Sequence, residues 1–94
     1  MIPDKAKFFR ALGDETRLSI VRYLLDKDFC ACRFAPMTKK DQTTVSRHLK
    51  VLSEAGILKS RKEGRNIIYS IRDDEVRKSL SIFGIKDLKP CCRG

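Results

Sequence analysis

A change in the spacing of apolar residues across residues 41–72 does most to restrict how this chain can fold. Asp41 is a good helix N-cap, and the apolar residues after it recur at i, i+4 and i+7 until Gly56 ends the helix. These apolar residues are Val45, Leu49 and Leu52. From residue 57 the pattern becomes that of two short strands, GILKSRK and IIYSIR, around a tight turn at Gly64. The segment therefore predicts a helix followed directly by a β-hairpin.

Further helices are predicted on both sides of this segment. Apolar stripes and helix-start residues favour helices over residues 3–12, 14–26 and 73–83. Residues 29–35 favour one or two more helical turns, which Pro36 is expected to stop. The predicted order is helix, helix, short helix, helix, hairpin, helix, so the fold class is mainly α with a small β-hairpin.

The length of the chain suits one domain. Its 94 residues leave no room for a second core, and a core this small gains stability by packing against a second copy. We expect one domain over residues 1–84 and a loosely ordered tail over residues 85–94.

Basic residues are concentrated around the predicted hairpin. The chain carries 21 Lys and Arg against 12 Asp and Glu, and nine of these basic residues but only three of the acidic ones lie between Lys39 and Arg72. A focused positive patch is typical of proteins that bind the phosphate backbone of nucleic acids, and a solvated surface is the alternative explanation.

Two helices that meet at a short turn, followed by a basic hairpin, have the arrangement of a winged helix-turn-helix. The helix over residues 41–55 has the dimensions to lie in a DNA major groove, and the hairpin can reach an adjacent phosphate as the wing. Arginine suits guanine, glutamine suits adenine, and hydroxyl groups serve either bases or phosphates. The candidate DNA-binding residues are Gln42, Thr43, Thr44, Ser46, Arg47, Lys50, Lys62 and Arg65. The alternative for each one is a solvated polar position.

Three stretches of the sequence carry a resemblance to a known family. They are ALGDETRLSIV, VSRHLKVLSEAGIL and EGRNIIYSI. With them, roughly residues 3–83 resemble the ArsR/SmtB family of dimeric, metal-responsive bacterial and archaeal repressors. The resemblance implies that the first and last helices pair across a two-fold axis, and that the homodimer binds double-stranded operator DNA with half-sites about 34 Å apart. The implied interface residues are Phe8, Phe9, Leu80 and Phe83, which the sequence alone would equally assign to an ordinary core.

The cysteines suggest what such a repressor would sense. The first residues contain neither a signal peptide nor a membrane span, so we expect a cytoplasmic protein whose thiols stay reduced and available to metals. Cys30 and Cys32 match the Cys-x-Cys pair of arsenic-responsive family members, and Ala35 stands where a third cysteine is often found. Cys91 and Cys92 are the candidates to complete the site, within one protomer or across two. The expected inducer is a thiophilic ion, As(III) or Sb(III) first, with Cd(II), Pb(II) and Hg(II) as further candidates.

A mechanism follows if both cysteines of the pair lie on one helix. Side chains at i and i+2 point roughly 200° apart on a helix, so Cys30 and Cys32 would grip one ion only if that turn unwinds. Unwinding ahead of the DNA-reading helix would then release the DNA.

Two other functions compete with this one. In the first, the same repressor senses oxidants, through a disulfide between Cys30 or Cys32 and the tail. In the second, the chain is a metal-binding interaction module whose basic surface is incidental. An enzyme is disfavoured, because no group is spaced to activate a cysteine and no phosphate loop is present. His48, the only histidine, is expected to pack or hydrogen-bond within the DNA-reading helix rather than to bind metal.

Overall fold

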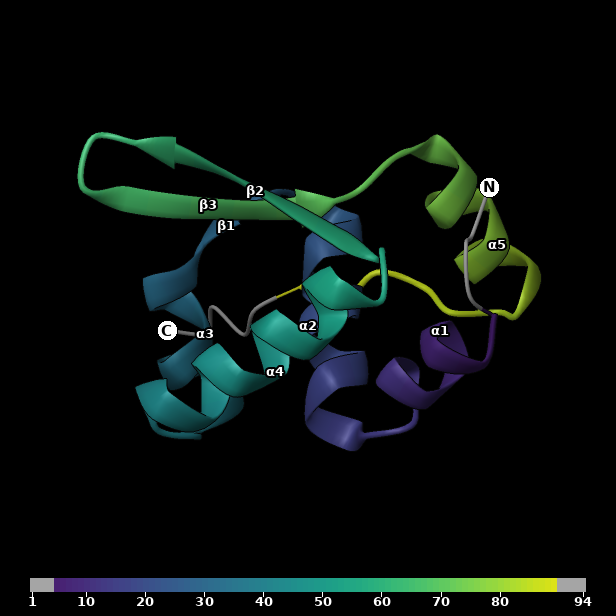
Figure 1. The fold of residues 1–94 in the computed structure, drawn as a ribbon, viewed down its shortest axis with the longest axis horizontal. Helices are drawn as coiled ribbons and strands as arrows, with labels where there is room; N and C mark the ends of the chain where they lie inside the picture. Colours follow the sequence, from purple (N-terminus) through teal and green to yellow (C-terminus); the bar gives the residue numbers. More distant parts are fainter. Residues whose placement is uncertain (1–4, 90–94) are drawn as a thin grey trace.

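A computed structural model describes residues 5–89 of the chain, which form five helices and three short strands (Figure 1). The elements are α1 (Lys5–Leu12), α2 (Glu15–Asp26), β1 (Phe29–Cys30), α3 (Ala31–Thr38), α4 (Gln42–Glu54), β2 (Leu58–Glu63), β3 (Asn66–Ile71) and α5 (Asp74–Ile82). The predicted helix order and the hairpin are confirmed. Together they form a winged helix-turn-helix in which α4 is the second helix of the motif and β2 and β3 form the wing.

Aspartate side chains start three of the helices. The carboxylate of Asp14 accepts hydrogen bonds from the first amides of α2, and those of Asp41 and Asp73 do the same for α4 and α5. These contacts satisfy amides that have no partner inside a helix, so the helix starts can be read from the sequence. At the other end of α4, Gly56 adopts a positive φ of 81°, which ends the helix as expected.

One strand was not predicted. β1 contains only Phe29 and Cys30 and pairs antiparallel with β3, which gives a three-stranded sheet of order β1-β3-β2. Two residues are too few for any periodic pattern, so only the pairing partner makes this segment a strand. The prediction of helical turns over residues 29–35 is therefore wrong at its start, because α3 begins at Ala31.

Pro36 does not stop α3 where the sequence predicts. The helix continues through Pro36 to Thr38 and ends at Lys39, whose φ of 60° is left-handed. Proline removes one hydrogen bond, that of its own missing amide to the carbonyl of Cys32, and the helix has only two residues left to run after it.

A single hydrophobic core joins the helices to one side of the sheet. Side chains from every element described contribute to it, among them Phe8, Leu24, Phe34, Leu49 and Leu80. Phe8 is 1% exposed and Leu80 is not exposed at all, so these two residues offer almost no surface to a partner. Phe8 and Leu80 therefore belong to the core, as the sequence alone allows for them, whereas Phe9 and Phe83 are about half exposed, at 50% and 54%.

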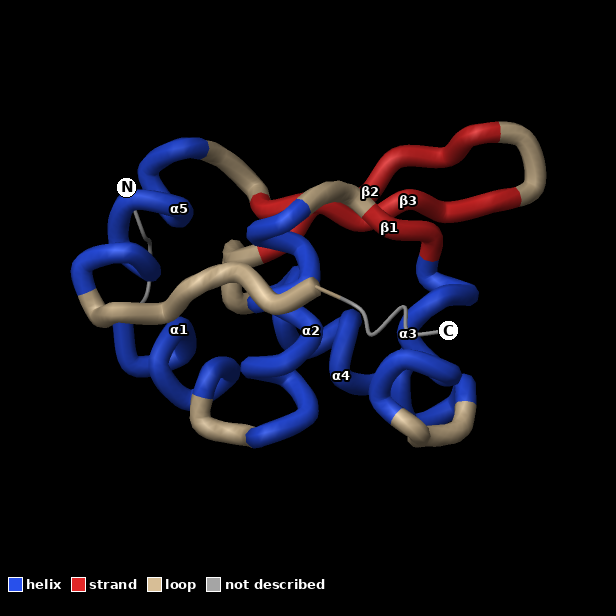
Figure 2. The backbone as a smooth tube through the Cα atoms, turned by 180° about the vertical axis from the view of Figure 1, so that it is seen from behind, coloured by secondary structure: helices blue, strands red, loops and turns tan. Residues whose placement is uncertain are grey.

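The chain does not leave the domain at the end of α5. Residues 84–89 cross the back of α2, as Figure 2 shows, in the same direction as α2 itself. The amide of Leu88 donates to the carbonyl of Arg22, and Lys89 forms an ion pair with Asp26 at 2.6 Å. The described part of the predicted tail is thus held along α2 and points toward β1.

Within residues 5–89, no helix has the length and apolar character that crossing a membrane requires.

Candidate nucleic-acid interface and thiol site

One face of α4 is polar and exposed. Its opposite face buries the apolar stripe that the sequence predicts, because helical spacing puts the two sets on different sides. Gln42, Thr43, Ser46, Arg47 and Lys50 are all exposed. Thr44 is half-buried, and its hydroxyl and amide both bind the carboxylate of Asp41 and lower the pKa of that carboxylate. Thr44 therefore serves the helix start and has less freedom to contact a ligand than its neighbours.

The wing carries a second group of basic residues. Lys62 and Arg65 are exposed near the β2–β3 turn, where Gly64 has a φ of 62°, and the far end of the hairpin projects beyond the helices (Figure 1). Arg61 is held differently, because its guanidinium contacts Asp28 at 3.0 Å and Glu63 at 2.8 Å. These two carboxylates raise the pKa of Arg61 and neutralise it locally. Lys62 and Arg65, near the turn, remain available to a polyanion.

The two cysteines of the pair lie at the joint between the sheet and α3. Cys30 is the last residue of β1 and the N-cap of α3, and Cys32 is the second residue of the helix. Because Cys30 has extended backbone angles, the two side chains meet, and their sulfur atoms lie 2.6 Å apart. The prediction that the helix must unwind for both thiols to reach one ion is therefore wrong. Its premise placed both cysteines inside one regular helix.

The two thiols have different acidities. The hydrogen bond between the two thiols lowers the pKa of Cys30, and the Cys32 and Ile67 amides contribute in the same direction. The same bond raises the pKa of the Cys32 thiol. The pKa of the Cys30 thiol therefore lies below that of the Cys32 thiol.

A shallow hollow of about 340 Å³ lies in front of the pair. Besides Cys30 and Cys32, its lining includes Gln42 from the start of α4 and Arg65 and Asn66 from the wing turn. This arrangement follows from the antiparallel pairing of Cys30 with Ile68, which places the residues after Cys30 beside those before Ile68. Two of the predicted DNA-binding residues thus share a hollow with the predicted metal ligands.

The donor set suits a thiophilic ion but is incomplete within residues 5–89. Two adjacent sulfurs are the donor type that soft ions such as Hg(II) or As(III) prefer. Across residues 5–89, no group of three or more Cys, His, Asp or Glu side chains is placed to hold a metal. Cys91 and Cys92 lie outside the described residues.

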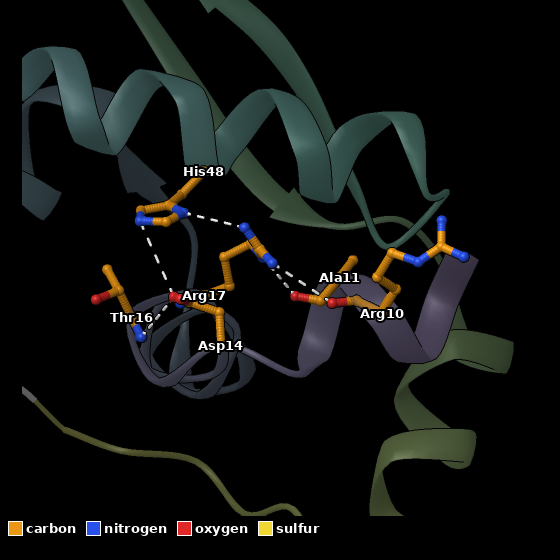
Figure 3. Close-up of polar contacts among 6 residues, drawn as sticks. All are labelled: Arg10, Ala11, Asp14, Thr16, Arg17 and His48. Atoms are coloured by element: carbon orange, nitrogen blue, oxygen red, sulfur yellow. Dashed lines mark hydrogen bonds and ion pairs between the residues drawn. The ribbon is translucent and has the colours of Figure 1, made fainter. Parts of the chain in front are cut away.

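A polar network that sequence analysis missed joins α1, α2 and α4 (Figure 3). Arg17 of α2 donates to the carbonyls of Ala11, at 2.7 Å, and Arg10, at 3.4 Å, and its third nitrogen lies 3.4 Å from Nδ1 of His48. Nε2 of His48 faces the Asp14 carboxylate at 3.9 Å. His48 does hydrogen-bond from within α4, as expected, but no pattern in the sequence indicated its partners.

An apolar surface remains exposed where α1 meets α5. Phe9 and Phe83 pack edge to face at 5.3 Å, and Ile82 beside them is 82% exposed. Together with Lys5, Phe8 and Ser79 they line a hollow of about 210 Å³ whose surface is mostly apolar. Three of the four predicted interface residues, Phe8, Phe9 and Phe83, line this hollow, although Phe8 itself is only 1% exposed.

Comparison with known proteins identifies the family. The family model for bacterial regulatory proteins of the arsR family matches residues 14–60. An HTH-type transcriptional regulator of Methanocaldococcus jannaschii, MJ1325, is 42% identical over 78 residues, which are 82% of this chain and 88% of that protein. The chain belongs to the ArsR family.

Other relatives and solved structures agree with this assignment. A homologue of the cadmium resistance regulator CadC from Staphylococcus aureus is 41% identical to this ArsR-family chain over 76 residues, 80% of this chain and 63% of that protein. The homodimeric winged helix-turn-helix domain of Mb0332 from Mycobacterium bovis superposes with a TM-score of 0.81 at 26% identity, covering 86% of this chain and 75% of that one. The ArsR-family chain is thus a transcriptional regulator and not an enzyme.

Proposed function

We propose that this ArsR-family protein is a homodimeric repressor that binds operator DNA and releases it when a thiophilic metal or metalloid binds its cysteines. One observation carries the proposal, the hollow that Cys30 and Cys32 share with Gln42 and Arg65. Any ion held by the two sulfurs lies beside side chains that we assign to DNA. Sensing and DNA binding therefore use neighbouring atoms.

The DNA-binding mode follows from the exposed face of α4. Gln42, Thr43, Ser46 and Arg47, near the start of the helix, reach base edges in the major groove, and Lys50 contacts phosphate. Thr44 contributes through its place at the helix start. Lys62 and Arg65 of the wing bind adjacent phosphates, which supplies salt-dependent affinity without sequence preference.

The apolar surface at α1 and α5 is the proposed dimer interface. Phe9, Ile82 and Phe83 expose large side chains that a second copy would cover, with Phe8 and Leu80 as the core beneath them. A two-fold axis through this surface gives two α4 helices spaced for half-sites about one DNA turn apart, near 34 Å.

Cys30 and Cys32 are the proposed ion ligands, with Cys91 and Cys92 as the source of further thiolates for ions that need three or four. The described part of the tail supports this role. Residues 84–89 run along α2 toward β1 and are anchored by Lys89 to Asp26, four residues before Cys30.

As(III) and Sb(III) remain the favoured inducers, and Cd(II), Pb(II) and Hg(II) are the alternatives. The names of similar proteins support both groups, since the arsenical resistance operon repressor of Escherichia coli is 38% identical over 66 residues and the CadC homologue 41% over 76.

Release needs no unwinding of α3. A bound ion supplies positive charge and a fixed link between the two sulfurs. Cys30 belongs to the wing sheet and Cys32 belongs to α3. A link between their sulfur atoms therefore fixes the angle between the wing and that helix. A coupling free energy of about 1 to 3 kcal/mol lowers DNA affinity about 5- to 150-fold, which is enough for release.

Fluorescence anisotropy tests the proposal. The reduced protein is bound to duplex DNA from its own upstream region and titrated anaerobically with As(III), Cd(II) and Zn(II). We expect release near one equivalent of As(III) or Cd(II), and loss of that response in Cys30→Ser/Cys32→Ser with unchanged DNA affinity. Cys91→Ser/Cys92→Ser, measured in parallel, reports whether the tail supplies ligands. Release of the Cys30→Ser/Cys32→Ser protein at the same dose would contradict the assignment.

A redox repressor is the second candidate, because the two sulfurs already touch and differ in acidity. A thiolate beside a thiol is the arrangement from which a disulfide forms on oxidation. DNA binding that ignores all three ions but ends on mild peroxide treatment, and returns with a reductant, would favour this candidate.

A further inference from the structure

Arg17 connects three helices through one side chain. The last carbonyls of α1 have no partner within their own helix, and Arg17 binds two of them, those of Arg10 and Ala11. Its remaining nitrogen reaches His48 in the middle of α4. Arg17 thus ties the end of α1 to the proposed DNA-reading helix (Figure 3).

The contacts of His48 require one form of its ring. The guanidinium of Arg17 is always a donor, so Nδ1 of His48, 3.4 Å away, must be the acceptor and carry no proton. The proton then lies on Nε2, which faces the carboxylate of Asp14 at 3.9 Å. Asp14 is itself fixed by the amides of Thr16 and Arg17, at 2.9 Å and 3.1 Å. Each contact in the network therefore has a fixed donor and acceptor, and the side chain of His48 is only 17% exposed.

The positions of the network residues in the chain suggest what it controls. His48 directly follows Arg47, a proposed base contact, and Arg10 directly follows Phe9 of the proposed dimer surface. Val45, Leu49 and Leu52 hold α4 against the core by apolar contacts, which have little directional preference. A satisfied, directional polar network is the kind of contact that selects one rotation of a helix about its axis.

We propose that Arg17 is a positioning residue that sets the rotation of α4 through His48 and links that rotation to α1 and the dimer surface. This inference rests on the proposed function, because it takes α4 to be the DNA-reading helix. A structural role limited to capping α1 is the alternative explanation. It predicts lower thermal stability in an Arg17 variant without any effect on His48 or on DNA binding.

The experiment uses the single histidine as a reporter. In the full-length reduced protein, ¹⁵N–¹H NMR of the imidazole is expected to show the wild-type ring protonated on Nε2 alone at neutral pH. In Arg17→Gln the preference for that tautomer weakens, and DNA affinity falls about 10- to 150-fold, the range expected for losing one hydrogen bond to a charged group. Arg22→Gln is the matched control. Arg22 lies on the same helix and bonds the carbonyl of Lys86 instead, so both readouts should match the wild type.

Two further variants separate positioning from folding. His48→Gln retains an oxygen that can accept from Arg17 and should keep affinity within about 3-fold of the wild type, whereas His48→Leu should lose as much as Arg17→Gln. The Arg17→Gln/His48→Leu double variant should be no weaker than either single one, because both remove the same link. A folded Arg17→Gln protein with wild-type tautomer and DNA affinity would overturn the inference. If the wild type bound no duplex DNA, the proposed function would fail, and the NMR comparison would still decide whether Arg17 orients His48.

Discussion

At the scale of single residues, two cysteines separated by one alanine differ in acidity. Cys30 ends a strand and its sulfur accepts from the amide of Cys32, which lies in the first turn of the helix, and the two thiols share a further hydrogen bond. The bond lowers the pKa of the Cys30 thiol and raises the pKa of the Cys32 thiol. Because the thiolate is the reactive form, Cys30 should be the first of the two to meet an electrophile or a metal.

This difference predicts selective alkylation. With less than one equivalent of iodoacetamide at neutral pH, we expect Cys30 to be modified several times faster than Cys32, as measured by peptide mass spectrometry of the reduced protein. Cys32→Ala removes the donor, so the half-point of the pH–rate profile of Cys30 should move to higher pH. Cys32→Ser keeps a hydroxyl donor and should move it less. Equal modification of both thiols in the wild type would contradict the assignment.

At the scale of elements, the wing is a hairpin whose basic residues are not equivalent. Arg61 is engaged by Asp28 and Glu63, while Lys62 and Arg65 have no carboxylate within ion-pair distance among the described residues. Asp28 precedes β1, so the same contact also ties the wing to the segment that carries the cysteines. We therefore expect the wing to make fewer phosphate contacts than its number of basic residues suggests.

The wing predicts a difference in salt dependence. Each phosphate contact contributes about one unit to the slope of log K against log salt concentration, so Arg65→Ala and Lys62→Ala should each lower the slope by about one. Arg61→Ala should change it by much less, because its charge is already paired. Anisotropy titrations at several salt concentrations measure the slopes, and an equal loss in all three variants would show that Arg61 leaves its carboxylates to bind DNA.

At the scale of the whole molecule, the exposed apolar side chains between α1 and α5 point to assembly. Ile82 is 82% exposed and contributes little to the core of its own protomer, although it borders Phe9 and Phe83. A dimer formed there would hold two DNA-binding units together, and the link between them raises affinity beyond that of either alone.

Ile82→Asp tests the assembly without disturbing the core. We expect a folded monomer by light scattering at micromolar concentration, where we expect the wild type to be a dimer, and DNA binding at least tenfold weaker because the half-sites bind separately. Val51→Asp is the control, since Val51 is an exposed apolar residue of α4 that does not line this hollow, and it should stay dimeric. A dimeric Ile82→Asp protein would place the interface elsewhere.

The features that sequence analysis predicted correctly are those formed by residues close together in the chain. An aspartate three residues before an amide, apolar side chains at helical spacing and a glycine at a tight turn make their contacts locally, so the helices, the wing and the winged helix-turn-helix order could be read directly. The family motifs are local in the same way. The exposed side of α4 followed from the same periodicity.

What could not be read depends on residues that are distant in the chain and meet only after folding. β1 exists because Cys30 finds Ile68, Arg61 is engaged because Asp28, 33 residues earlier, lies beside it, and His48 meets Arg17 across 31 residues. The contact between the two thiols shows this. The sequence identified Cys30 and Cys32 as a pair, but it wrongly placed both of them inside one helix. Whether Cys30 belongs to a helix or ends a strand is set by its partner strand, because a two-residue segment has too few contacts of its own to choose.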